Sequence, residues 1–277
     1  MDTGIHLILS VGAFALGACI ASFLNVVIWR VPRGESIVRP PSHCPKCGAL
    51  IRWWQNVPIV SWLALRGRCA GCKAPISPRY VIVEALGGAL FLAVFMNFGP
   101  GIATVVCWIW VSLMLTGSFI DFDHKLLPDF VTVGGMVLGI VNAALLYALF
   151  PALRAVSFFS LSNPLTNSLM GLAFGFGLLW AVRDIGSRAF KREAMGLGDV
   201  FLMGAVGAIF GPLAVLVTLV LSSLFGSVVG VGMILMSKAR LGRFVEIPYG
   251  PYICAGCLAW MFFGCEIIGW YVGLFAG

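Results

Sequence analysis

The sequence predicts an all-α polytopic membrane protein with eight transmembrane helices and a small zinc-stabilised lobe between the first two. Hydrophobic residues make up 60% of the chain and charged residues only 10%, whereas a soluble domain carries about 25% charged residues. Apolar stretches of the roughly 20 residues needed to cross a bilayer recur along most of the sequence. The one long polar loop contains four cysteines in two CxxC pairs.

The first predicted helix covers about residues 5–29. The segment Met1-Asp2-Thr3-Gly4 has no basic residue, and the apolar run continues to Trp29. This run is longer than the apolar core of a cleaved signal peptide, so we expect an anchoring helix.

The basic residues predict the orientation of the remaining helices. Nine of the 18 Lys and Arg residues lie between Arg30 and Arg79. The others, apart from Arg154, fall in three further groups: Lys125; Arg183, Arg188, Lys191 and Arg192; and Lys238, Arg240 and Arg243. The positive-inside rule places all four groups in the cytoplasm. Each apolar stretch between two groups must then leave the cytoplasm and return, so it holds two helices.

Three helical hairpins follow from this rule. They cover residues 81–120, broken at 97–101; residues 130–182, with an outer loop at 151–167; and residues 200–236, broken near Gly211-Pro212. With a last helix at about 252–275 this gives eight spans, of which the sixth is short, and both termini outside. We expect a first helix at 1–29, a cytoplasmic zinc-binding lobe at 30–80 and a seven-helix membrane core at 81–277.

The net charge of +7 would also suit a nucleic-acid-binding protein. The positions of the basic residues are explained by orientation and by attraction to anionic lipid. We therefore expect a lipid bilayer and no nucleic acid as a partner.

The pairs Cys44-Pro-Lys-Cys47 and Cys69-Ala-Gly-Cys72 are separated by 21 residues, which is typical of a four-thiolate zinc site. Reactive thiols or disulfides are the alternative interpretation. The loop is expected in the cytoplasm, where thiols stay reduced, and this favours zinc.

Four acidic residues lie near predicted helix ends: Asp121, Asp123 and Asp129 after the third span, and Asp199 at the start of the sixth. Asp129 and Asp199 could each be a helix cap. Asp121 and Asp199, however, are predicted at the same membrane face, where ionisable residues are costly and usually functional. Two carboxylates that share one proton can act as general base on a water and as general acid on a carbonyl.

The sequence resembles the type IV prepilin peptidases, which are GxGD-type aspartic proteases of bacterial inner membranes. The resemblance extends over nearly the whole chain. Its motifs are Gly17–Pro32, the two CxxC pairs with Pro58–Leu63 between them, Ile76–Tyr80, Glu84, the Asp121–Asp129 turn, Arg192–Asp199 and Ile247–Tyr252. It implies that Asp121 and Asp199, not Asp123 or Asp129, are the catalytic pair.

The resemblance implies two activities. One removes the basic leader of prepilins of type IV pili or pseudopilins of type II secretion at the cytoplasmic face. The other N-methylates the new N-terminal residue with S-adenosylmethionine, and the zinc-bearing loop is typical of members that perform both reactions. The methyl-donor residues are not indicated by any motif, and we expect most of them in the lobe. Glu193, with Glu35 or Glu84, is a candidate partner for basic leader residues, and helix-cap or solvated roles are the alternative.

Two other functions are compatible with parts of the sequence. A proton-coupled transporter would also contain membrane carboxylates, but usually near the midplane and in repeated halves. A scaffold could recruit partners through a zinc lobe, but it gives no reason for the Gly196-Leu197-Gly198-Asp199 turn. A third CxxC pair, Cys254 and Cys257, lies in the last apolar span and is interpreted as incidental. His124 could tune the carboxylate pair or bind the substrate, and the alternative is a surface histidine at a helix end.

Overall fold

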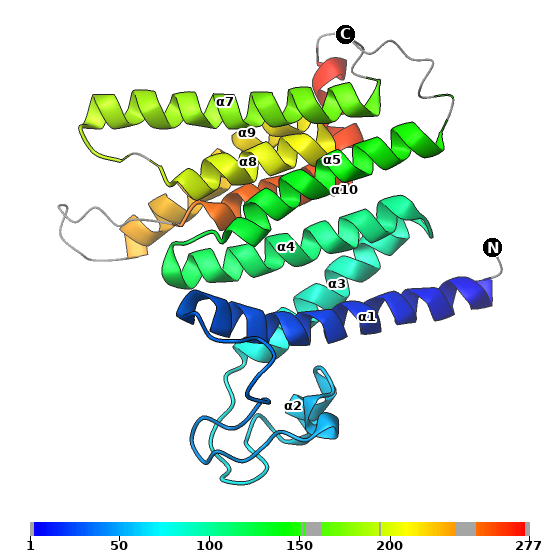
Figure 1. Cartoon of the computed structure of the whole chain (residues 1–277), viewed down its shortest axis with the longest axis vertical. Helices are drawn as coiled ribbons and strands as arrows, with labels where there is room; N and C mark the ends of the chain where they lie inside the picture. Colours follow the sequence, from blue (N-terminus) through cyan, green and yellow to red (C-terminus); the bar gives the residue numbers. More distant parts are fainter. Residues whose placement is uncertain (1–2, 151, 153–161, 194, 237–247, 275–277) are drawn as a thin grey trace. The chain divides into compact units, whose positions relative to one another are not determined.

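The computed structural model describes residues 3–150, 152, 162–193, 195–236 and 248–274 (Figure 1). Within these residues the chain is helical and forms no named strand. The α-helices are α1 (Thr3–Arg30), α2 (Val60–Ala64), α3 (Arg79–Phe98), α4 (Ile102–His124), α5 (Asp129–Leu149), α7 (Pro164–Phe190), α8 (Leu197–Phe210), α9 (Pro212–Met236) and α10 (Gly250–Gly273). The chain divides into two compact units, Met1–Thr116 and Gly117–Gly277, and each is described separately.

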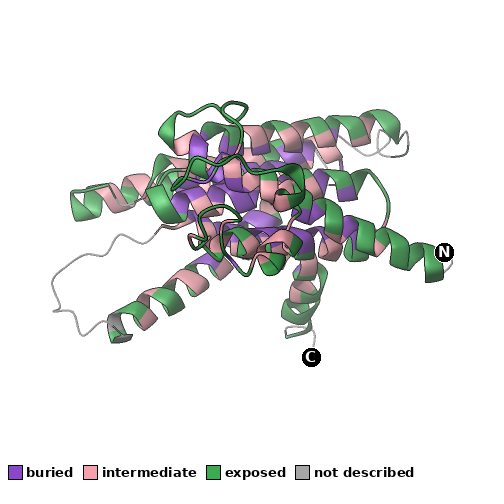
Figure 2. Ribbon diagram, turned by 90° about the horizontal axis from the view of Figure 1, so that it is seen from below, coloured by how far each residue is buried: buried purple, intermediate pink, exposed green. Residues whose placement is uncertain are grey.

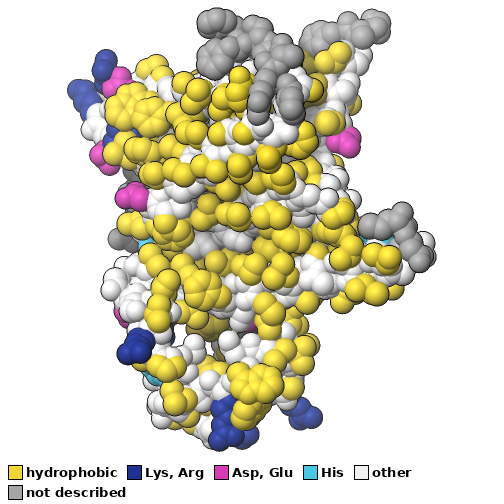
Figure 3. All heavy atoms as spheres, turned by 45° about the vertical axis from the view of Figure 1, so that its right-hand side comes forward, with side chains coloured by type: hydrophobic (Ala, Val, Ile, Leu, Met, Phe, Trp, Pro, Cys, Tyr) yellow, Lys and Arg dark blue, Asp and Glu magenta, His cyan; other side chains and the backbone are white. Residues whose placement is uncertain are grey.

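Seven of these helices are long and apolar enough to cross a membrane, and α8 is a shorter apolar helix. Together they match the eight predicted spans, including the short sixth one. Figure 2 shows the buried residues on the inner faces of the helices, and Figure 3 shows hydrophobic side chains over most of the visible helix surface. Outward-facing side chains such as Val220 and Val228 of α9 are 66% and 64% exposed. Contact with lipid tails accounts for this exposure of large apolar residues.

The predicted breaks in two hairpins are confirmed. Helix α3 ends at Phe98 and α4 begins at Ile102, and between them Gly99 has a φ of 67°. Helix α8 ends at Phe210 and α9 begins at Pro212, and between them Gly211 has a φ of 88°. Glycine adopts these positive φ values without steric cost. Arg154 of the predicted outer loop, and Lys238, Arg240 and Arg243, lie outside the described residues.

In the first unit, α1 and α3 pack closely through small residues. A Cβ atom on Gly17 would lie 2.5 Å from the carbonyl oxygen of Gly87 and 2.6 Å from Cβ of Phe91. At the end of α1 that leads into the lobe, the side-chain amide of Asn25 donates to the carbonyl of Tyr80 at 3.2 Å. Membrane helices commonly associate through small residues, because lipid provides no hydrophobic driving force between them.

In the second unit, α8 contacts α5, α7, α9 and α10. Asp199, Val200 and every residue from Leu202 to Ala208 are buried. The backbones approach closely at glycines: Cβ atoms on Gly139 and Gly175 would lie 2.5 Å from backbone atoms of α8. At Gly171 and Gly207 the two helices α7 and α8 are in direct backbone contact.

We expect Gly171→Ala to destabilise the second unit, because its methyl group would collide with the carbonyl of Gly207. Backbone cannot move aside as a flexible side chain can, and overpacking of this kind costs about 1–3 kcal/mol. Thermal unfolding in detergent should show a melting temperature several degrees lower.

Gly177→Ala is the matched control on the same helix, since no atom lies within 4 Å of the added Cβ. Its melting temperature should equal or exceed that of the unmodified protein. Equal melting temperatures for the two variants would contradict the close packing of α7 on α8.

Candidate functional site

Asp121 lies in the last turn of α4 and is only 6% exposed. Its Oδ2 accepts a hydrogen bond of 3.0 Å from the backbone N–H of Gly250, the first residue of α10. A Cβ atom on Gly250 would lie 2.8 Å from the same oxygen. A side chain at position 250 would therefore displace this carboxylate oxygen.

Asp199 is the third residue of α8 and is 8% exposed. Its carboxylate accepts a hydrogen bond from the backbone N–H of Gly196, the N-cap residue. This hydrogen bond is one half of a capping box. The prediction that Asp199 could itself be the N-cap is therefore wrong, because the N-cap is Gly196, three residues earlier. The carboxylate also interacts electrostatically with that of Asp121. The two aspartates predicted to meet at one membrane face thus lie at one end of the same unit.

Leu127, in the turn after α4, packs against the first turns of α8 and α10. A Cβ atom on Gly198 would lie 2.8 Å from Cβ of Leu127, and one on Gly250 would lie 3.3 Å from its Cδ1. The turn after α4 thereby contacts the first turns of both α8 and α10. Both Leu127 and Gly250 stand in motifs that carry the family resemblance, but no local pattern predicts this contact.

The other acidic residues of the turn have different surroundings. Asp123 and Asp129 are exposed, and so is His124, the last residue of α4. Asp129 is the first residue of α5 and follows the N-cap Pro128. It occupies the first helical turn, where a negative charge is favourable. Burial thus distinguishes Asp121 from Asp123 and Asp129, which the sequence pattern alone does not.

The third CxxC pair is buried in α10. Cys254 forms a hydrogen bond with the side chain of Ser118 and lies within electrostatic range of both aspartates. Cys254 therefore lies in the interior of the second unit, near the two carboxylates. The described residues contain one possible metal-binding group of three or more side chains, and it does not include this pair.

That metal-binding group consists of Cys44, Cys47, Cys69 and Cys72, whose Sγ atoms all lie within 4.8 Å of one another. The Sγ atoms of Cys44 and Cys72 are 3.8 Å apart. The four cysteines predicted as ligands are thus gathered at one point of the lobe. The lobe includes α2 in Figure 1, and Figure 3 shows Lys and Arg side chains at its surface.

Two knuckles with the same backbone pattern hold the cysteines. In the first, the backbone N–H of Cys44 donates to the carbonyl of Ala49, and the carbonyl of Cys44 accepts from the N–H of Gly48. In the second, Cys69 makes the same bonds with Ala74 and Lys73. Gly48 and Lys73 have φ values of 70° and 61°. Short bridges, His43 with Leu50 and Arg68 with Pro75, close the two knuckles.

Each knuckle directs backbone N–H groups at its first thiol. Those of Cys47 and Lys46 lower the pKa of the Cys44 thiol, and those of Cys72 and Gly71 lower the pKa of the Cys69 thiol. Since the thiolate is the form that binds metal, this arrangement favours a cation at the centre of the four sulfurs.

Two protein-family models match this chain, one over its N-terminal part and one over its C-terminal part. Residues 15–98 match the family model described as the bacterial peptidase A24 N-terminal domain. Residues 108–231 match the type IV leader peptidase family. No solved structure matches the chain.

Three relatives are each named prepilin leader peptidase/N-methyltransferase. The one from Myxococcus xanthus is 43% identical over 84% of this chain, which spans 65% of that protein's length. The one from Aeromonas hydrophila is 36% identical over 94% of this chain and 92% of its own. The one from Legionella pneumophila is 34% identical over 96% of this chain and 94% of its own.

Proposed function

Because this chain belongs to the type IV leader peptidase family, we propose that it is a bifunctional prepilin leader peptidase and N-methyltransferase. Its substrates are prepilins or pseudopilins with a basic leader. The names of the relatives support both activities. The observation that supports the peptidase activity is that Asp121 and Asp199, two buried carboxylates 78 positions apart in the sequence, lie close enough to interact electrostatically.

We propose complementary roles for the two aspartates. One is ionised and removes a proton from a water, whose oxygen bonds to the carbon of the scissile carbonyl. The other is protonated and donates its proton to the carbonyl oxygen. When the tetrahedral species collapses, the C–N bond breaks and the amine leaves with a proton. The N–H of Gly250 fixes Oδ2 of Asp121, which leaves Oδ1 of this carboxylate to hold the water.

The methyltransferase activity requires a donor near the new amine. S-adenosylmethionine supplies a methyl group that bonds to the amine nitrogen as its bond to sulfur breaks. The chain must bind this donor, orient the amine and release one proton to water. None of these tasks needs the carboxylate pair, so we assign them to the first unit, which contains the cysteine lobe.

We propose zinc as the ion of the four-cysteine cluster. Zn–S bonds of about 2.3 Å in a tetrahedron place the sulfurs about 3.8 Å apart, which fits the 3.8 Å between Sγ of Cys44 and Sγ of Cys72. The four cysteines leave no open position for a reactant, as in structural zinc sites. The role of zinc here is to hold a lobe with few buried residues, since Cys69 is only partly buried and Cys47 and Cys72 are exposed.

The chain is a polytopic membrane protein, and we place it in the bacterial inner membrane with the lobe and the carboxylates at the cytoplasmic side. In the second unit, Lys125 follows the helix end that carries Asp121. Arg183 is tied by a hydrogen bond of 3.1 Å to Met195, just before α8. Basic residues and carboxylates therefore share one end of this unit, as the positive-inside rule requires. Eight spans then put both termini outside.

We expect Asp121→Asn and Asp199→Asn each to abolish leader cleavage, with at least a thousandfold loss. Neither the base nor the acid can be replaced by an amide. The double variant should be no worse than either single one, because the two groups act as a unit. Cleavage is measured with a purified prepilin, and Asp123→Asn and Asp129→Asn are the controls at exposed positions. Cleavage by well-expressed Asp199→Asn would rule out the aspartic-protease mechanism.

Removal of zinc should unfold the lobe, because the free energy of metal binding contributes to folding. We expect about one zinc per chain by metal analysis, and none in the variant Cys44→Ser plus Cys72→Ser. Hydrogen exchange of residues 40–78 should then be fast, while that of α8 is unchanged. The matched control is Cys254→Ser plus Cys257→Ser, which should keep its zinc. Full zinc occupancy in the lobe variant would contradict this site.

We expect Glu193→Lys to weaken processing of a basic leader about threefold, the size of an exposed charge contact. Glu193 is 84% exposed and lies 3.5 Å from Arg183. By contrast Glu84 is buried and is not available to a leader. Initial rates are compared for a natural leader and one with its basic residues changed to glutamine.

The matched control is Asp184→Lys, because the side chain of Asp184 is 44% exposed and is paired with an arginine of α7, Arg188. It should affect both leaders equally. If Glu193→Lys slowed both leaders to the same extent, Glu193 would have only a structural role.

A further inference from the structure

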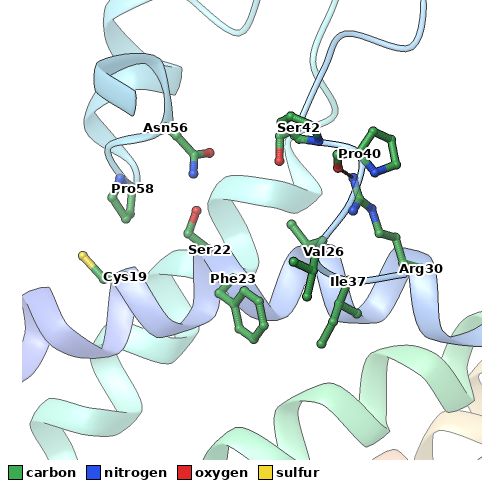
Figure 4. A pocket seen from close by; sticks show the side chains of 12 residues that line it. Cys19, Ser22, Phe23, Val26, Arg30, Ile37, Pro40, Ser42, Asn56 and Pro58 are labelled. Carbon is green, nitrogen blue, oxygen red and sulfur yellow. Dashed lines mark hydrogen bonds between the residues drawn. The ribbon is translucent and has the colours of Figure 1, made fainter. Parts of the chain in front are cut away.

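The first unit contains a pocket of about 400 Å³ between α1 and the lobe (Figure 4). One face of α1 forms its floor, with side chains at the helical spacing of Cys19, Ser22, Phe23, Val26 and Arg30. The remaining lining residues come from two lobe segments: Ile37, Val38, Pro40, Pro41 and Ser42, and Asn56 with Pro58. The volume falls within the range of about 300–1,000 Å³ that is usual for small-molecule sites.

Arg30 gives this pocket its charge. It is 8% exposed, and its guanidinium donates from Nη1 to the carbonyl of Ser36 at 2.9 Å and from Nη2 to that of Pro40 at 2.7 Å. A guanidinium has five N–H donors, so the Nε–H and one N–H on each terminal nitrogen remain. Among the described residues no carboxylate pairs with Arg30, and no acid lines the pocket. A buried cation without a counter-ion is costly, so the site favours an anionic group.

A second buried charge fixes the opposite wall. Glu84 of α3 is 8% exposed, and its Oε2 accepts the backbone N–H of Ile59 at 2.7 Å. Ile59 has a φ of 63°, an unusual value for a β-branched residue. Its neighbour Pro58 lines the pocket. Arg30 thus holds the segment from Ser36 to Pro40, and Glu84 holds the segment that ends at Ile59, so both walls are preformed.

We propose that this pocket binds S-adenosylmethionine, with the guanidinium of Arg30 on the carboxylate of its amino-acid part. This inference rests on the proposed methyltransferase activity and assigns it a site. The hydroxyls of Ser22 and Ser42 and the amide of Asn56 are suited to ribose hydroxyls and to the edge of adenine. They also offer uncharged oxygens to the ammonium and sulfonium groups. Glu84 is a positioning residue, since it acts through Ile59.

The phosphate of a lipid headgroup could satisfy the same guanidinium. The polar groups opposite Arg30 favour the nucleoside, because a phospholipid would bring acyl chains rather than hydroxyls to them. Experiments in membranes of different charge separate these two sources of an anion.

The test measures binding of S-adenosylhomocysteine, the demethylated product, by calorimetry with the full chain in phosphatidylcholine nanodiscs. Ser22→Leu fills the floor of the pocket and should raise the Kd at least tenfold. The methylated fraction of cleaved pilin should fall in parallel. Ser10→Leu makes the same change on α1 outside the pocket and should leave the Kd unchanged. Equal Kd values for Ser22→Leu and the unmodified protein would overturn the proposed site.

A second comparison isolates Arg30. Arg30→Lys keeps the charge but loses the planar fork that matches a carboxylate. It should therefore raise the Kd of S-adenosylhomocysteine at least tenfold. Methylthioadenosine, which lacks the amino-acid part, should bind this variant and the unmodified protein equally. If the Kd values of both compounds rose equally, Arg30 would only hold the segment from Ser36 to Pro40, and its assignment to the carboxylate of the ligand would be wrong.

Two further results are decisive. If Ser22→Leu left the Kd of S-adenosylhomocysteine unchanged but abolished a preference of the protein for phosphatidylglycerol over phosphatidylcholine, the pocket would be a lipid site and the inference would fail. If the unmodified protein methylated pilin while Ser22→Leu retained full binding, the donor site would lie elsewhere and the proposed function would stand. An unmodified protein that neither cleaved nor methylated would instead refute the proposed function itself.

Discussion

The close approach of α8 to α5 and α7 is the constraint on which the second unit depends. A helix of 14 residues is too short to span a bilayer alone, so it must be surrounded by protein. Glycines at the contacts, such as Gly139, Gly171 and Gly207, allow its backbone to touch theirs. Burial of α8 along almost its whole length fixes the position of its first turn, and with it the carboxylate of Asp199.

The ends of three helices then determine the surroundings of the carboxylates. Asp121 closes α4, Asp199 lies in the first turn of α8, and Gly250 opens α10. Backbone N–H groups of Gly250 and Gly196 satisfy one oxygen of each aspartate. A helix N-terminus carries partial positive charge. The same end of the unit can therefore hold two acidic groups near each other in a mostly apolar environment.

Much of this arrangement could be predicted from the sequence, because membrane helices are specified by length, hydropathy and the glycines and prolines that end them. The break at Gly211-Pro212 and the four clustered cysteines are examples. The choice of Asp121 over Asp123 came only from the family resemblance, since both stand in the same polar turn. Burial of Asp121 depends on Gly250, 129 positions away, and no local pattern reveals that contact. Burial of Glu84 against Ile59 was missed for the same reason.

The two family models divide the chain much as the structure does, with one match at residues 15–98 and the other at 108–231. The carboxylate pair belongs to the second unit, whereas the cysteine lobe and the Arg30 pocket belong to the first. The proposed chemistry links them in one order. Before cleavage, the nitrogen that will be methylated is part of the scissile peptide bond, and an amide nitrogen cannot accept a methyl group. It becomes a nucleophilic amine only when the C–N bond is broken. On the proposed assignment of sites, cleavage in the second unit must therefore precede methyl transfer in the first.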